Sequence, residues 1–145
     1  MQMVLARRSG LARAFTLVEL IAVIVVLAIL AGVAVPKYFD YTAKAKESAT
    51  KATLGGVRAA IANFYANSIV STGTATYPTL TQLTTIGTVL NEAMPKNPYN
   101  DSSAVSAATW AATPPVTGSA GWNYDVANGR FWANSTTSGV NEHLW

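Results

Sequence analysis

An apolar segment near the start of the chain most constrains its fold. Of the 21 residues from Phe15 to Val35, only Thr16, Glu19 and Gly32 are not hydrophobic. A helix of this length covers about 31 Å, which is close to the hydrocarbon thickness of a bilayer. The segment therefore predicts one membrane-spanning helix over residues 15–36.

Two kinds of cleaved signal also combine arginines with an apolar segment. One is an ordinary secretory signal cut near Ala34, and the other is a twin-arginine signal beginning at Arg7-Arg8. A signal of this kind has an apolar core of roughly 7–15 residues, shorter than the segment found here. Neither signal explains why a carboxylate, that of Glu19, lies inside the apolar segment, four residues after its start at Phe15.

The net charge of +3 belongs to the first fourteen residues of the chain. Arg7, Arg8 and Arg13 lie there without an acidic residue, and the rest of the chain balances seven Lys and Arg against seven Asp and Glu. Because the chain beyond residue 14 has no net charge, we expect no nucleic-acid partner. The arginine cluster favours a cytoplasmic N-terminus, with the residues after the span exported.

Glu19 is the residue of the apolar segment that most needs an explanation. A carboxylate at the centre of a span costs about 2.5–3.5 kcal/mol on insertion scales, and less near the ends. One interpretation is that Glu19 lies at the interface and contacts water. In another, the chain is cut before Phe15, and the new α-amine, with a pKa of about 8, pairs with Glu19 of a neighbouring copy and sets the axial register.

The string Ala14-Phe15-Thr16-Leu17-Val18-Glu19 follows a short basic leader and opens the apolar helix. It resembles the class III signal of type IV prepilins and of the pseudopilins of type II secretion. The resemblance implies that a membrane prepilin peptidase removes residues 1–14, cuts between Ala14 and Phe15, and N-methylates Phe15. It also implies that Glu19 is the assembly carboxylate. The family usually has glycine where this chain has Ala14; because alanine is the next smallest residue, we expect cleavage to persist.

The helix is expected to continue beyond the span. Pro36 lacks an amide donor and Gly32 has a low helix propensity, so we expect a weak point or kink between them. Apolar residues then recur at spacings of three and four, which predicts that residues 37–68 form an amphipathic half packed on a domain: Leu54, Val57, Ile61, Phe64, Tyr65 and Ile69. A signal anchor followed by an independent soluble helix is the alternative.

Residues 69–145 have a different composition. They hold twenty Ser and Thr, seven Asn and all four tryptophans, but only six charged residues. This composition favours a compact exported domain that contains β structure. Residues 77–83 indicate a loop leading into a short helix, and residues 94–99 an irregular connection.

The clearest strand signal is an alternation of aromatic and polar residues from Trp122 to Val126, followed by the turn Ala127-Asn128-Gly129. It predicts a β-hairpin over 121–133 whose aromatic face packs on the helix. We assign no element to 104–115 and expect a surface loop there. The predicted fold is α+β and pilin-like, with a long kinked N-terminal helix packed against a small antiparallel sheet.

The sequence offers few groups for catalysis or metal binding. It has no cysteine, and its only histidine, His143, lies in a polar tail where we expect it to be solvated. Neither a Ser-His catalytic set nor a histidine zinc site can be assembled from these residues, so we expect no enzyme. The candidate ligands for a calcium ion are Asp101, Asp125 and Glu142, although their spacing matches no calcium-loop motif and solvated surface carboxylates are the alternative.

The resemblance implies a structural subunit of a type IV pilus-like filament, held in the bacterial inner membrane before assembly. The absence of a cysteine pair and the short hairpin ending favour a type II secretion pseudopilin, with a type IV pilus major pilin as the alternative. The implied partners are other copies of the chain, membrane lipids, a prepilin peptidase and an inner-membrane assembly platform. A signal-anchored periplasmic binding domain, in which Glu19 is incidental, is the alternative from another class.

Overall fold

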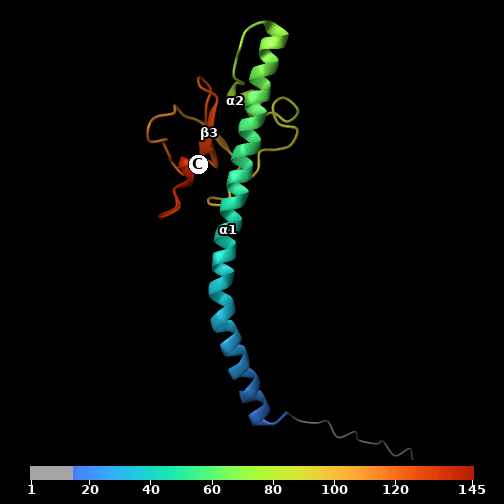
Figure 1. Cartoon of the computed structure of the whole chain (residues 1–145), viewed down its shortest axis with the longest axis vertical. Coiled ribbons are helices and arrows are strands. Elements are labelled where there is room, and N and C mark those ends of the chain that lie inside the picture. Colours follow the sequence, from blue (N-terminus) through green and yellow to red (C-terminus); the bar gives the residue numbers. More distant parts are fainter. Residues whose placement is uncertain (1–14) are drawn as a thin grey trace, which may run out of the picture. The chain divides into compact units, whose positions relative to one another are not determined.

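The computed structural model describes residues 15–145 (Figure 1). The predicted leader, residues 1–14, and with it Ala14, lies outside the described residues. In chain order the elements are helix α1 (Leu17–Thr72), helix α2 (Leu80–Thr84), strands β1 (Val105–Ala107), β2 (Trp122–Asp125) and β3 (Arg130–Ala133), and a short 3-10 helix η1 (Glu142–Leu144).

Helix α1 runs through Pro36 without a break in its helical assignment. The chain divides into two compact units within this helix, the first ending at Tyr41 and the second covering Thr42–Trp145. In the first unit every residue from Phe15 to Tyr41 is exposed. In the second unit α1 contributes five buried residues: Thr50, Leu54, Val57, Ile61 and Ser68.

The core of the second unit lies between α1 and the sheet. Leu54, Val57 and Ile61 recur every three or four residues on one face of α1, as the sequence predicted, and all three are buried. They pack against Leu83 of α2 and against aromatic residues of the hairpin: Trp122, Tyr124 and Phe131. In Figure 1 this part of α1 runs beside β3.

The predicted apolar stripe of α1 is less buried toward its end. Phe64 and Tyr65 are only half-buried, and Tyr65 stacks on Tyr77 with ring centroids 4.5 Å apart. Ile69, which we expected on the packed face, is 46% exposed. After Thr72 the chain folds back along α1, and the amide of Thr76 donates to the hydroxyl of the buried Ser68 at 2.9 Å, so this return covers one side of the helix end and leaves Ile69 exposed.

The three strands form a mixed sheet in the order β1-β2-β3. β2 and β3 are antiparallel, with Tyr124 opposite Phe131, and form a hairpin where the sequence predicted one. β1 lies parallel to β2, with Val105 opposite Trp122. The α+β fold is confirmed, but the expected antiparallel sheet gains this parallel strand, which falls in the stretch 104–115 that we expected to be a loop.

The second face of the sheet, which carries the polar residues of the alternation, is also covered. All four residues of β2 are buried, including Asn123 and Asp125. The chain before β2 explains this burial. Asn123 Nδ2 and Trp132 Nε1 both donate to the carbonyl of Pro115, at 2.8 and 3.0 Å, so residues around 110–117 lie over this face.

Candidate functional site

The first turn of α1 carries the residues that the sequence singled out. Thr16 precedes the helix, and its amide and its hydroxyl both donate to Glu19 Oε2, each at 2.9 Å. The amide of Glu19 donates back to Thr16 Oγ1 at 3.2 Å. This reciprocal arrangement is a capping box, in which Thr16 is the N-cap and Glu19 the third helical residue.

The capping box gives Glu19 a role that our sequence interpretation missed. The signal was present, since a threonine followed three residues later by glutamate marks a helix start. The carboxylate also lies at the positive end of the helix dipole, where a negative charge is stabilising. Within the described residues Glu19 Oε1 accepts no hydrogen bond, so one oxygen holds the cap while the other stays available.

Phe15 lies beside this cap and is 82% exposed. The helix that follows contains a window that is long and apolar enough to cross a membrane, and it is the only such helix among residues 15–145. A helix that is apolar all round needs an apolar environment, which is either lipid or other helices. Gly32 and Pro36 lie within this exposed stretch, and a Cβ placed at Gly32 would meet no atom within 4 Å other than the adjacent residues and the backbone of its own helix.

Each of the three candidate calcium ligands has its own protein partners. Asp101 is exposed and pairs with Lys96, whose Nζ lies 3.1 Å from Oδ1. Asp125 accepts from the amides of Trp110 and Ala127, both at 2.9 Å. Within residues 15–145 no three His, Cys, Asp or Glu side chains gather into a group that could hold a metal ion.

Glu142 lies on η1 and is fully buried. It accepts from the amide of Thr137 at 2.9 Å and from its hydroxyl at 3.0 Å. Burial acts to raise the pKa of Glu142, but hydrogen bonds from its own amide, Thr137 and Ser135 outweigh burial and lower the pKa. Glu142 therefore ties the C-terminal segment to the loop that precedes it.

Asp125 and His143 are the remaining polar residues that the sequence analysis singled out. The amide of Trp110 is the main cause that lowers the pKa of Asp125, against the opposing effect of burial. His143, which we expected to be solvated, is half-buried, and its Nδ1 is buried without a hydrogen-bond partner. It lies in no group of potential metal ligands among the described residues.

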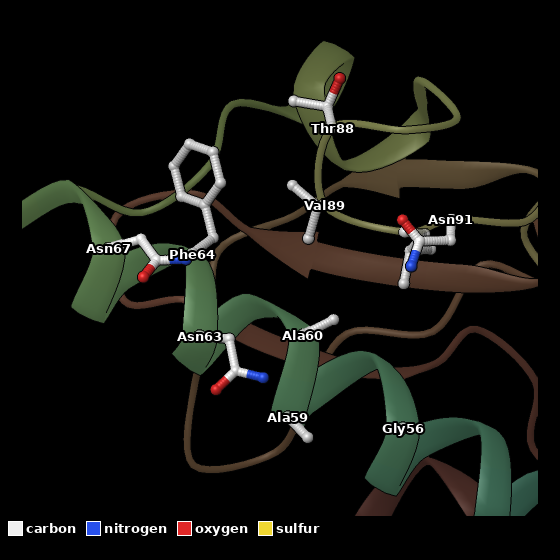
Figure 2. A pocket seen from close by; sticks show the side chains of 10 residues that line it. Gly56, Ala59, Ala60, Asn63, Phe64, Asn67, Thr88, Val89 and Asn91 are labelled. Carbon is white, nitrogen blue, oxygen red and sulfur yellow. The ribbon is translucent and has the colours of Figure 1, made fainter. Parts of the chain in front are cut away.

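A cavity of 380 Å³ lies between α1 and the loop of residues 88–91 (Figure 2). Its α1 side consists of small residues, two amides and one aromatic ring: Gly56, Ala59, Ala60, Asn63, Phe64 and Asn67. No side chain that lines it is charged. The cavity offers hydrogen bonds to a neutral partner but no group that could exchange a proton or attack a substrate.

Comparison with known proteins finds type IV pilins. The chain is 42% identical over 59 residues to the type IV major pilin protein PilE1 of Neisseria gonorrhoeae, a match covering 41% of this chain and 36% of that protein. It is also 42% identical over 59 residues to a fimbrial protein of Neisseria meningitidis serogroup B, covering 41% and 35%. Over these residues the chain is similar to type IV pilins.

A third relative is the type IV narrow pilus major component PilA5 of Thermus thermophilus, which is 45% identical over 51 residues, covering 35% of this chain and 44% of that protein. The chain thus spans little more than a third of the length of the first two pilins and under half of the third. No family model and no solved structure matches it. The resemblance to type IV pilins is confirmed, whereas nothing among these relatives favours the secretion pseudopilins.

Proposed function

We propose that this chain is a structural subunit of a type IV pilus-like filament. The observation that carries the proposal is the exposed apolar stretch of α1. Every residue from Phe15 to Tyr41 is exposed, yet the same helix continues into a folded core built on Leu54, Val57 and Ile61. Burying that stretch, first in lipid and then among equivalent helices, is a strong driving force for assembly.

The proposed mechanism is packing and electrostatics, not catalysis. Removal of residues 1–14 would leave a cationic amine on Phe15, next to the cap formed by Thr16 and Glu19. In a low-dielectric filament core the carboxylate of Glu19 needs a cationic partner, and the Phe15 amine of a neighbouring copy supplies one. Glu19 Oε1 accepts no hydrogen bond within residues 15–145, so it is the oxygen that would take the amine.

The cap also lowers the cost of holding Glu19 in the membrane before the subunit is assembled. In the single chain Glu19 Oε2 is satisfied by the amide and hydroxyl of Thr16. Two donors from the same chain lower the cost of holding a carboxylate at the edge of the apolar segment. The expected partners are lipids at this stage, followed by a prepilin peptidase and an inner-membrane assembly platform, with the N-terminus cytoplasmic.

Two kinds of filament fit this mechanism. The relatives bear the names of pilus proteins, which supports a type IV pilus subunit. The absence of cysteine, by contrast, is the feature that favours a type II secretion pseudopilus that supports protein export. Deleting the gene separates them: loss of surface filaments with normal export indicates a pilus, and loss of export without loss of surface filaments indicates a pseudopilus.

Substitutions at Glu19 test the charge pairing apart from the helix cap. Glutamine also serves as the third residue of a capping box, so Glu19→Gln keeps the cap and removes the charge. Breaking a buried ion pair costs about 3–5 kcal/mol, so we expect both Glu19→Gln and Glu19→Ala to lower the yield of sheared filaments by at least about tenfold. Membrane insertion and folding of the C-terminal unit should be unchanged.

The matched control is Glu92→Ala, which removes an exposed carboxylate from the C-terminal unit. It should leave the filament yield as in the wild type. Normal assembly of Glu19→Gln would contradict the charge pairing and reduce Glu19 to a helix cap. A chain that is never recovered in filaments, even when overproduced with its assembly machinery, would instead support a signal-anchored binding domain.

A further inference from the structure

A second cavity in the C-terminal unit has a different chemistry. It measures 310 Å³ and is lined by Arg58 of α1, by Trp110, and by Gly129, Arg130 and Phe131 of the hairpin. We call it the arginine pocket. None of its lining residues is acidic, and two of the five are arginines, which is unusual in a domain with so few charged side chains.

Arg58 is held in place by main-chain oxygens. Its Nε donates to the carbonyl of Phe131 at 3.0 Å, and its Nη2 donates to the main-chain oxygen of Trp145. The carbonyl of Phe131 faces away from β2, because Phe131 and Tyr124 form a non-hydrogen-bonded pair of the hairpin. Arg58 thus covers the outward carbonyl of β3 with one N–H group and reaches Trp145 with another, which leaves three of its five N–H groups without a protein acceptor among the described residues.

The Arg130 side chain is positioned by an aromatic ring and forms no ion pair among the described residues. Its guanidinium carbon lies 4.6 Å from the centroid of the Trp110 ring, a cation-π contact. Trp110 is itself fixed by an edge-to-face contact with Trp132, at 5.2 Å between centroids. Within residues 15–145 the Arg130 side chain forms no hydrogen bond and no ion pair, so all five of its N–H groups are free to bind a ligand.

The acidic residue of the hairpin, Asp125, forms its side-chain hydrogen bonds with groups other than Arg130. Asp125 is the register partner of Arg130 across the hairpin. Its carboxylate instead accepts from the amides of Trp110 and Ala127 and from Asn128 Nδ2. Two guanidinium groups therefore line one cavity whose five lining residues include no carboxylate.

We propose that the arginine pocket binds a phosphate monoester or inorganic phosphate. Guanidinium groups bind tetrahedral oxyanions through paired N–H donors, and a dianion would neutralise both arginines at once. The volume admits one phosphate group with a small substituent. The phosphate can be inorganic phosphate in solution or the terminal monoester of a lipid headgroup, and the pocket recognises the dianion that both share. This inference is independent of the proposed filament.

Titration of the full chain in nonionic detergent micelles tests the proposal. Inorganic phosphate and glycerol 3-phosphate are added separately at constant ionic strength, and the Gly129 amide and Trp110 indole resonances are followed by NMR. We expect both resonances to shift and to saturate. Equal affinities would identify free phosphate as sufficient, and tighter binding of glycerol 3-phosphate would identify the headgroup as the source.

Variants of Arg130 decide whether the pocket is responsible. Arg130 is exposed, so Arg130→Gln should fold normally and weaken phosphate binding by about tenfold or more. Arg130→Lys keeps the charge but loses the paired donors, and should bind with intermediate affinity. Lys44→Gln, which removes an exposed cation elsewhere on α1, should change the affinity by less than about twofold. Shifts that fail to saturate, or an equal effect of Lys44→Gln and Arg130→Gln, would overturn the proposal.

Discussion

The amide and the hydroxyl of Thr16 converge on a single oxygen of Glu19, at 2.9 Å each. The residue that the sequence marks for assembly is therefore also the residue that starts the helix. Because both donors come from Thr16, the two roles of Glu19 can be separated by changing its neighbour and leaving the carboxylate in place.

Thr16→Ala should loosen the first turn of α1. It removes the N-cap hydroxyl, and the loss of such a cap costs about 0.5–2 kcal/mol of helix stability. Hydrogen exchange in micelles measures the effect, and we expect the amide of Glu19 to exchange on the order of 2- to 30-fold faster. Thr16→Ser keeps the hydroxyl and should exchange like the wild type. Equal exchange in all three chains would contradict the cap.

The C-terminal unit should lose stability in acid. Hydrogen bonds lower the pKa values of both Asp125 and Glu142 in the folded chain. A carboxylate with a lowered pKa stabilises the fold above its unfolded pKa, about 3.9 for Asp and 4.3 for Glu, and this contribution is lost as the pH falls through the folded value. Denaturation followed by tryptophan fluorescence should give a free energy of unfolding that is level from pH 7 to 5 and falls below about pH 4.

Glu142→Gln identifies how much of this acid sensitivity comes from one residue. The variant loses charge-assisted hydrogen bonds from Thr137, so we expect it to be about 1.5–3 kcal/mol less stable at pH 7. It should also lose less stability than the wild type when the pH falls. The exposed Glu92→Gln serves as control and should match the wild type at every pH. An unchanged pH dependence in Glu142→Gln would exclude Glu142 as a cause.

Gly129 is required at the hairpin turn for two reasons. Its φ is +64°, and a Cβ there would lie 2.3 Å from Cε1 of Tyr77, which is itself stacked on Tyr65. Gly118 also has a positive φ, +72°, but a Cβ placed on it would meet no atom within 4 Å beyond the adjacent residues. Gly118→Ala therefore measures the backbone cost alone, and we expect Gly129→Ala to be about 1–3 kcal/mol less stable than Gly118→Ala. Equal stabilities would show that Tyr77 moves aside freely.

The sequence predicted those parts of the fold that local patterns specify. The spacing of Leu54, Val57 and Ile61 predicted the packed face of α1, and the alternation around Trp122 with the turn at Gly129 predicted the hairpin. β1 escaped prediction because it has only three residues and its parallel pairing with β2 is long-range. Its position depends on long-range contacts, such as the hydrogen bond that the Gly121 amide donates to the carbonyl of Ala104 at 3.0 Å. A local sequence pattern does not predict such a contact.

The candidate site was predicted in part. The spacing of Thr16 and Glu19 contained the capping box, but the apolar surroundings directed our interpretation to assembly alone. The grouping of Asp101, Asp125 and Glu142 as calcium ligands rested on composition, and the structure gives each carboxylate its own partners. Which donors reach a buried carboxylate depends on tertiary packing, and spacing along the chain does not reveal it.

The intact mass of the subunit recovered from sheared filaments tests the central claim most directly. The account predicts a chain that begins at Phe15 and carries one added methyl group, which leaves the amine four residues from Glu19. Recovery of a chain that still contains residues 1–14, or one that begins near Val35 after removal of the apolar segment, would contradict it.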